Sequence, residues 1–222
     1  MRWFLAEGAT GGTFDEFVLI ANPNAAPATL KVSYLRAGQA PIVQQHTAAA
    51  FSRLTLWVDQ AAPELAIAEV SVVVESLTPT PIVVERSMWW RASPAGEWVE
   101  AHNSRGATAT AARWLVADGE AGGAGQASTY VLVANTSGTA QSVRFTLLPE
   151  AGAPRTVTDT VSANGRFSLD VAAAFPGLAT RFSVLVESTG GSAPLVVERA
   201  SYSSTPTTPW ASGTNALAMP LP

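Results

Sequence analysis

The sequence repeats its main motifs at a nearly constant distance. Three pairs of motifs match: WFLAEG at 3–8 with WLVADG at 114–119, FVLIAN at 17–22 with YVLVAN at 130–135, and VVER at 83–86 with VVER at 196–199. The offset between matching residues is 111 to 113. This is the size of an ordinary domain, and a chain of 222 residues holds two of them. The repeat therefore predicts two copies of one unit, residues 1–110 and 111–222.

Within each copy the apolar pattern is that of β-strands. β-Branched and aromatic residues form short runs between turn signals, for example at residues 16–22, 28–36 and 128–135. No helical segment is long enough for the crossovers of a parallel sheet. With about seven short strands per copy, we expect an all-β fold made of two tandem, duplicated antiparallel β-sandwich domains of the immunoglobulin-like class.

Three finer features are expected in the connections. A proline-bearing hairpin is predicted at residues 75–81, and a short linker between the copies at residues 102–112. Each copy is also expected to contain one helical turn, opened by Asp59 in the first copy and by Asp170 in the second as N-cap residues.

Charge and cysteine content exclude several classes of function. The net charge is −4, and neither copy carries a basic stripe, so a nucleic-acid partner is not expected. The absence of cysteine excludes disulfides, thiol nucleophiles and thiolate metal sites. No run of 18 apolar residues occurs, and a transmembrane segment is therefore not expected.

The residues needed for catalysis or cofactor binding are poorly represented. The two histidines are His46, in a strand-like run, and His102, in the expected linker; no Gly-x-Ser-x-Gly motif is present. Calcium-loop, zinc-ligand and phosphate-loop spacings are also missing. We therefore predict a protein that is not an enzyme and that has no metal site and no cofactor.

Acidic and basic residues recur together in both copies. Two glutamates in one copy could act as acid and base on a glycoside, but a neighbouring guanidinium favours the ionised carboxylate and so opposes the role of a general acid. We interpret these residues instead as a repeated structural network that holds strands in register. The predicted network consists of Arg53, Glu75, Glu85 and Arg86 in the first copy and Arg166, Glu187, Glu198 and Arg199 in the second.

Tryptophans provide the main functional lead. Trp57, Trp89 and Trp90 occur only in the first copy. Neighbouring residues of a strand point to opposite faces, so only one of Trp89 and Trp90 can enter the core. The other packs against the second copy or Trp98, or it stacks on a ligand; for the ligand case the predicted site is Trp89, Trp90 and Arg91, with a glycan as the ligand. The tryptophans kept in both copies, Trp3 with Trp114 and Trp98 with Trp210, are expected in the cores.

As a set, the motifs resemble a known kind of repeat. WFLAEGAT, FVLIANP, VVER and EAHNS of the first copy are similar to repeats of large, uncharacterised bacterial surface or secreted proteins, and the resemblance covers essentially the whole chain. It implies an extracellular or cell-surface location and a tandem β-sandwich module, and it transfers no catalytic residue. No signal peptide precedes Trp3, so we expect the chain to be a segment of a longer protein.

Two hypotheses of different classes follow. The first is a non-catalytic structural or adhesion module, serving as a spacer in a repeat array or as the subunit of a self-assembling filament. Its partner is another protein or a second copy, bound through sheet edges such as that of residues 3–6. The alternative is a carbohydrate-binding module that uses an exposed tryptophan of the first copy.

Overall fold

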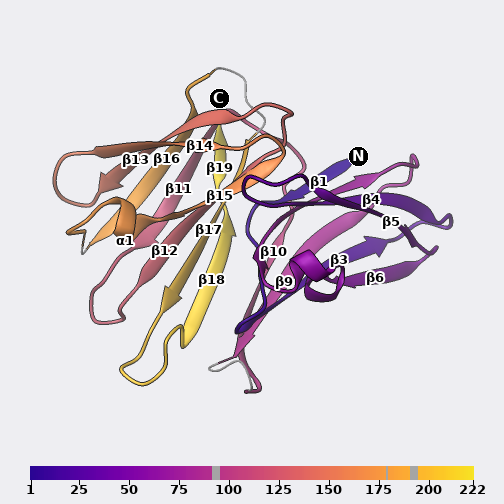
Figure 1. Ribbon diagram of the computed structural model, residues 1–222, viewed down its shortest axis with the longest axis horizontal. Helices are drawn as coiled ribbons and strands as arrows, with labels where there is room; N and C mark the ends of the chain where they lie inside the picture. Colours follow the sequence, from indigo (N-terminus) through magenta and orange to yellow (C-terminus); the bar gives the residue numbers. More distant parts are fainter. Residues whose placement is uncertain (92–95, 179, 191–194) are drawn as a thin grey trace.

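The computed structural model describes residues 1–91, 96–178, 180–190 and 195–222, and its secondary structure is nearly all β. The first half, residues 1–110, contains β1 (Arg2–Leu5), β2 (Ala9–Thr10), β3 (Phe14–Asn22), β4 (Ala28–Leu35), β5 (Ile42–Ala48), β6 (Ser52–Trp57), β7 (Ala68–Glu69), β8 (Ser71–Ser76), β9 (Val83–Arg91) and β10 (Trp98–Arg105). The second half, residues 111–222, contains β11 (Arg113–Glu120), β12 (Ser128–Asn135), β13 (Gln141–Pro149), β14 (Arg155–Val161), β15 (Gly165–Asp170), β16 (Arg181–Ser188), β17 (Leu195–Ser203), β18 (Ser212–Leu217) and β19 (Met219–Leu221). The two halves lie side by side, each as its own stack of strands (Figure 1). In the described part of the chain, no helix is long and apolar enough to cross a membrane.

The strand order of the first half recurs in the second. The first half forms the sheets β1-β8-β4-β5 and β10-β9-β3-β6, and the second forms β11-β16-β13-β14 and β18-β17-β12-β15. Strand β19 is added beside β11, and a small β2-β7 ladder lies in the first half. The pairings within these sheets are antiparallel. The all-β prediction is confirmed, and the sequence motifs that repeat also occupy matching places in the strand orders.

Each half buries apolar side chains between its two main sheets. In β4, Leu30, Val32 and Tyr34 are fully buried, whereas Lys31 and Ser33 between them are partly exposed, as expected for a strand with one face in the core. The matching strand β13 shows the same alternation. Trp3 and Trp114, which were predicted to lie in the cores, are 8% and 2% exposed, and that prediction is confirmed.

The hairpin predicted at residues 75–81 is wrong. Strand β8 pairs with β1 and β4, while β9 pairs with β3 and β10 in the other sheet of the first half. The proline-bearing segment therefore carries the chain from one layer to the other. The same proline and threonine residues suit both kinds of connection, and the local sequence does not distinguish them.

The helical turns occur, but only one of the two predicted caps does. Residues Val58–Gln60 and Pro63–Leu65 form 3-10 turns η1 and η2, and Val171–Ala174 form α1. Asp170 caps α1, since its carboxylate accepts a hydrogen bond from the Ala173 amide at 3.1 Å. Asp59 instead accepts from the main-chain amides of Gly11 (3.1 Å) and Glu16 (3.0 Å) across the half.

The linker predicted at residues 102–112 is also wrong in its first part. Residues 102–105 belong to β10, which pairs along β9, and the matching strand of the second half is β18. Polar residues such as His102 and Asn103 have low strand propensity, so this edge strand forms through pairing and packing rather than through local preference.

One buried asparagine in each half joins three carbonyl groups. Asn22 and Asn135 occupy the last position of the matching strands β3 and β12, and they are 1% and 0% exposed. The Nδ2 groups donate to the main-chain oxygens of Ala26, Ala48 and Ala49 in the first half and of Thr139, Val161 and Ser162 in the second, at 2.8–3.2 Å. Each amide thus joins the end of one strand to the segment that follows it and to the end of a second strand.

Replacing either asparagine by alanine is expected to destabilise the protein. Asn22→Ala and Asn135→Ala each leave buried carbonyl groups without donors, and each is expected to lower the free energy of unfolding by about 2–3 kcal/mol. Urea denaturation followed by tryptophan fluorescence measures the change, with Gln45→Ala on the exposed side of β5 as control. Values for the asparagine variants equal to that of the control would contradict this role.

Candidate functional site

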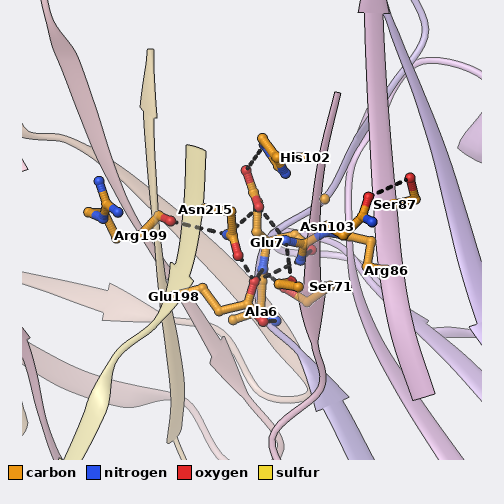
Figure 2. A network of polar contacts seen from close by, with 12 residues as sticks. Ala6, Glu7, Ser71, Arg86, Ser87, His102, Asn103, Glu198, Arg199 and Asn215 are labelled. Carbon is orange, nitrogen blue, oxygen red and sulfur yellow. Dashed lines mark hydrogen bonds and ion pairs between the residues drawn. The ribbon is translucent and has the colours of Figure 1, made fainter. Parts of the chain in front are cut away.

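The contact between the halves is built around a buried arginine. Arg86, on β9, is fully buried. Its Nη1 donates to Oε2 of Glu198 at 2.7 Å and to the main-chain oxygen of Glu7 at 2.8 Å. Its Nη2 donates to the Glu7 carboxylate and to Oγ of Ser104, the latter at 2.8 Å. Figure 2 shows Glu7 and Arg86 of the first half next to Glu198 of the second.

Glu198 also binds the main chain of the first half. Its carboxylate accepts from the amides of Ala6 and Glu7, each at 3.2 Å. Asn215 on β18 donates to the Glu7 carboxylate and to the main-chain oxygen of Arg199, the latter at 3.1 Å. The second half therefore binds the residues after β1 through the carboxylate of Glu198 and the amide of Asn215, both of which are directed at the first half (Figure 2).

A second arginine crosses the contact in the other direction. Arg166 on β15 is 3% exposed, and its Nη1 donates to the main-chain oxygen of Gly8 at 2.8 Å. Its Nη2 donates to Oγ of Ser168 at 2.8 Å, and Nη1 lies 3.6 Å from the carboxylate of Glu69. The main chain of residues 6–8 of the first half is thus bound by two charged side chains of the second half.

Burial and charge set the protonation of this network. Burial raises the pKa of Glu7, against the opposing charges of Arg86 and Arg166. Burial by itself lowers the pKa of Arg86, but the charges of Glu198 and Glu7 outweigh it and raise that pKa above its ordinary value. Burial, followed by the charge of Arg86, lowers the pKa of His102 to about 4. The arginine therefore stays charged and the histidine stays neutral near pH 7.

Glu16 lies next to this network, and its carboxyl group makes no hydrogen bond to the described residues. It is fully buried on β3, and neither carboxylate oxygen has a hydrogen-bond partner among the described residues. Burial raises its pKa well above the ordinary value, which favours the neutral acid. Its carboxyl group lies against Gly8, where a Cβ would meet both Glu16 and the main-chain oxygen of Val70. The glycine of WFLAEG is thus required by close packing.

Aromatic side chains from both halves complete the contact. Trp90 is 1% exposed and Tyr202 is 5% exposed, and their rings meet edge to face with centroids 5.6 Å apart. The indole Nε1 of Trp90 donates to the main-chain oxygen of Trp210 at 2.8 Å. A pocket between the halves is lined by Phe14, Tyr130, Tyr202 and Trp210 together with Arg166. Trp90 is therefore an interface residue and is not available to an external ligand.

The structure separates the three predicted ligand-binding residues. As predicted for neighbouring strand residues, Trp90 is buried while Trp89 is 38% exposed. The Arg91 guanidinium pairs with Asp15 at 2.7 Å and lies over the ring of Trp98, 5.3 Å from its centroid. Of the three, only Trp89 presents a large aromatic surface to solvent.

Trp89 belongs to a row of aromatic residues on the first half, which we call the aromatic strip; its three tryptophans are exposed and Phe17 is half-buried. The strip runs Trp57, Phe17, Trp98, Trp89, with successive ring centroids 5.3, 6.2 and 5.4 Å apart. The core position predicted for Trp98 is wrong, because this residue begins the edge strand β10 next to a bulge and is 44% exposed. Its indole Nε1 donates to Asp15 at 2.6 Å, which fixes the ring on the sheet.

The eight residues predicted as one network form several clusters. Glu75 pairs with Arg2 and Lys31 at 3.2 and 2.9 Å, and Glu187 pairs in the same way with Arg113 and Arg144 at 3.1 and 2.8 Å. These two clusters tie β8 and β16 to their neighbouring strands.

Of the remaining six residues, the structure brings Arg86 and Glu198 together, and they come from different halves. Arg166 joins the same contact, while Arg199 pairs with Asp118 at 3.2 Å. Arg53 and Glu85 are exposed on the sheet that carries the aromatic strip. Their counterparts Arg166 and Glu198 are buried, so matching sequence positions have different surroundings in the two halves.

Sequence reasoning missed Glu7, Asn215 and the burial of His102. The acidic residue of WFLAEG, repeated as Asp118 in WLVADG, was the available signal, because a charged residue kept at the end of two buried strands needs a partner. The partner of the Glu7 carboxylate could not be identified, since Arg86 lies 79 residues away in the chain. Among the residues that the structure describes, no group of three His, Asp or Glu side chains lies close enough to hold a metal ion.

The comparisons with known proteins give little further information. Neither a scan against protein-family models nor a search of curated proteins gives a match. Among solved structures, the chain is similar to the crystal structure of Thermotoga maritima 1070, with a TM-score of 0.42 and 19% identity over 48% of this chain and 91% of that chain. It is also similar to the Anabaena sensory rhodopsin transducer, with a TM-score of 0.32 and 21% identity over 37% of this chain and 89% of that chain. Likeness at this level carries no argument about function.

Removing Glu198 is expected to weaken the contact strongly. Glu198→Ala leaves the guanidinium of Arg86 buried with one carboxylate fewer, and we expect a loss of about 3–5 kcal/mol in the free energy of unfolding. The matched control is Glu85→Ala, the same position of the exposed copy, for which we expect a change below about 0.5 kcal/mol. Chemical denaturation of the two variants measures the difference, and similar values for both would contradict the importance of the buried pair.

The stability of the protein is expected to depend on the titration of His102. The pKa of this histidine is lowered in the folded chain, so its contribution to stability is present above pH 6.5 and is lost as the pH falls toward about 4. Over that range, the free energy of unfolding of the wild type is expected to fall by roughly 3 kcal/mol relative to that of His102→Gln. Urea denaturation at a series of pH values measures this, with His46→Gln as control. Parallel pH profiles for wild type and His102→Gln would contradict the expectation.

Proposed function

We propose that the chain is a non-catalytic structural or adhesion module of an extracellular or cell-surface protein. It consists of two tandem immunoglobulin-like β-sandwich domains, residues 1–110 and 111–222, and serves as a spacer in a repeat array or as a filament subunit. The matching strand orders of the two halves and the resemblance of the motifs to bacterial surface repeats support this proposal.

The observation that carries the proposal is the buried charged contact between the halves. Rotation of one half against the other exposes Arg86 and separates it from Glu198, which makes such movement costly. The connection between the halves is held as well, because Ala107 exchanges main-chain hydrogen bonds with Phe4 at 2.8 and 2.9 Å. Two units fixed in one orientation transmit direction and distance, and this is the property that a spacer or filament subunit needs.

Small-angle X-ray scattering of the monomer tests the rigid pair. The scattering curves of the wild type and of Glu85→Ala are expected to fit a single arrangement of the two halves. Glu198→Ala is expected to give a larger radius of gyration and a curve that requires several arrangements. Wild-type scattering that already requires several arrangements would overturn the proposal.

A carbohydrate-binding module is the second candidate. The observation that favours it is the aromatic strip, because exposed tryptophan faces can stack on sugar rings. A groove beside Trp57 also carries Gln44, His46 and Gln60, which are polar enough to bond hydroxyl groups. Glycan-array binding that is lost in Trp89→Ala and kept in Ile67→Ala, an exposed residue outside the strip, is the expected result for this candidate. No binding by the wild type would remove it.

A further inference from the structure

The two halves contact each other through different surfaces. The first half contributes residues 6–8, at the end of β1, together with Arg86; we call residues 6–8 its docking loop. The second half contributes the outward face of the β18-β17-β12-β15 sheet, on which Glu198 and Arg166 bind that loop. A contact between two different surfaces is heterologous. The second half therefore still has a free surface of the kind that the first half uses in the contact, and the first half has a free surface of the kind that the second half uses.

The first half has its own outward face, and this face is uncovered. By strand register, Arg53 matches Arg166 and Glu85 matches Glu198, so the face carries the same two charged groups. The apolar residues of this face are exposed, whereas their counterparts on the face of the second half are buried. Val196 is 0% exposed while its counterpart Val83 is 45% exposed, and Tyr202 is 5% exposed while its counterpart Trp89 is 38% exposed.

The second half has a segment in the matching place, at the irregularity in the pairing of β11 with β16; we also call it a docking loop, although it lies within β11, and it is uncovered too. Residues 117–119 match residues 6–8, and Asp118 pairs with Arg199 just as Glu7 pairs with Arg86. The Asp118 side chain is 80% exposed, compared with 4% for that of Glu7. Ala117 is exposed, whereas Ala6 is fully buried in the contact.

We propose that the docking loop of residues 117–119 in one copy of the chain binds the outward face of the first half of a second copy. Glu85 then accepts hydrogen bonds from the amides of Ala117 and Asp118 of the other copy and pairs with its Arg199, as Glu198 does within the chain. This proposal rests on the structural function proposed above and specifies how such a module associates.

The side chains around the two surfaces are complementary in size. Where the first half presents Met88 and Trp90 to the contact, the second half has the smaller Ser201 and Ser203 at the matching strand positions. The uncovered face compensates, because it has Trp89 where the covered face has Tyr202. In the proposed contact between copies, the larger apolar side chain is thus on the sheet face, whereas in the contact within the chain the larger side chains are beside the docking loop.

The charged pair favours a second copy over a glycan as the occupant of this face. Stacking on sugar rings uses the aromatic strip alone, and it does not explain why Arg53 and Glu85 match the residues that bind a docking loop within the chain. Association through the edge of β1 is less favoured, because Ala107 already occupies that edge at Phe4. Since each copy has one free face and one free loop, copies add in one direction and form an open chain or a ring.

Sedimentation velocity with two complementary variants tests the proposal. Glu85→Arg prevents the outward face of the first half from binding a docking loop, and Ala117→Arg prevents the docking loop of the second half from binding a face. Both positions are exposed, so neither change disturbs a core. Between about 10 µM and about 1 mM, the weight-average sedimentation coefficient of the wild type is expected to rise, while each variant alone stays monomeric. A 1:1 mixture of the two variants is expected to form a dimer and nothing larger, because it contains one intact face and one intact loop per pair. Ile67→Arg, at an exposed position outside both surfaces, is expected to behave as the wild type.

Three results would overturn the proposal: a wild type that stays monomeric throughout, variants that associate as the wild type does, or a mixture that forms no dimer. A monomeric wild type whose glycan binding is lost in Trp89→Ala would assign the face to a sugar instead. The monomeric double variant Glu85→Arg/Ala117→Arg separates this proposal from the proposed function. If its scattering shows a fixed pair of halves while the wild type does not associate, the structural module stands and only the mode of association fails.

Discussion

The arrangement of the two halves depends on one buried guanidinium. Arg86 is surrounded by main chain and carboxylates that come from both halves, and taking its charge out of water is tolerable only while Glu7 and Glu198 are in place. The apolar parts of the contact, such as Trp90 against Tyr202, tolerate small displacements, whereas the charged group does not. The aromatic residues thus supply buried area, and the charges determine which orientation is allowed.

The duplication explains why a heterologous contact arises without any new motif. Both halves carry the Ala-acidic-Gly loop and the Val-Val-Glu-Arg strand, so each has both surfaces. Joining two such units in one chain covers the docking loop of the first unit and the outward face of the second. The copies differ at these surfaces: Trp89 replaces tyrosine where the face is open, and Ser201 and Ser203 replace larger residues where the loop side is open.

Much of the fold can be predicted from the sequence, because strand cores have a local signature. The run predicted at residues 128–135 coincides with β12, and the alternation along β4 identifies its buried face. Strand β10 could not be predicted, since its polar residues form a strand only by pairing with β9 and packing near β18. The hairpin was mistaken for the same reason: the choice of sheet for β9 is made by its distant neighbours. Of the site, Trp89 could be identified as one of two candidates, but the pairing of Arg86 with Glu198 has no local or periodic signal.

The glycine shared by WFLAEG and WLVADG changes how these repeats are compared. In the first half, a methyl group on Gly8 would strike the Glu16 carboxyl and the Val70 carbonyl. In the second half, a methyl group on Gly119 would strike the ring of Phe182. The same letter is required in both copies by different neighbours, neither of which lies in the motif. In an alignment of such repeats, an invariant glycine here would mark a shared lack of space rather than a shared turn, and a substitution in one copy would need its compensating change at a position specific to that copy.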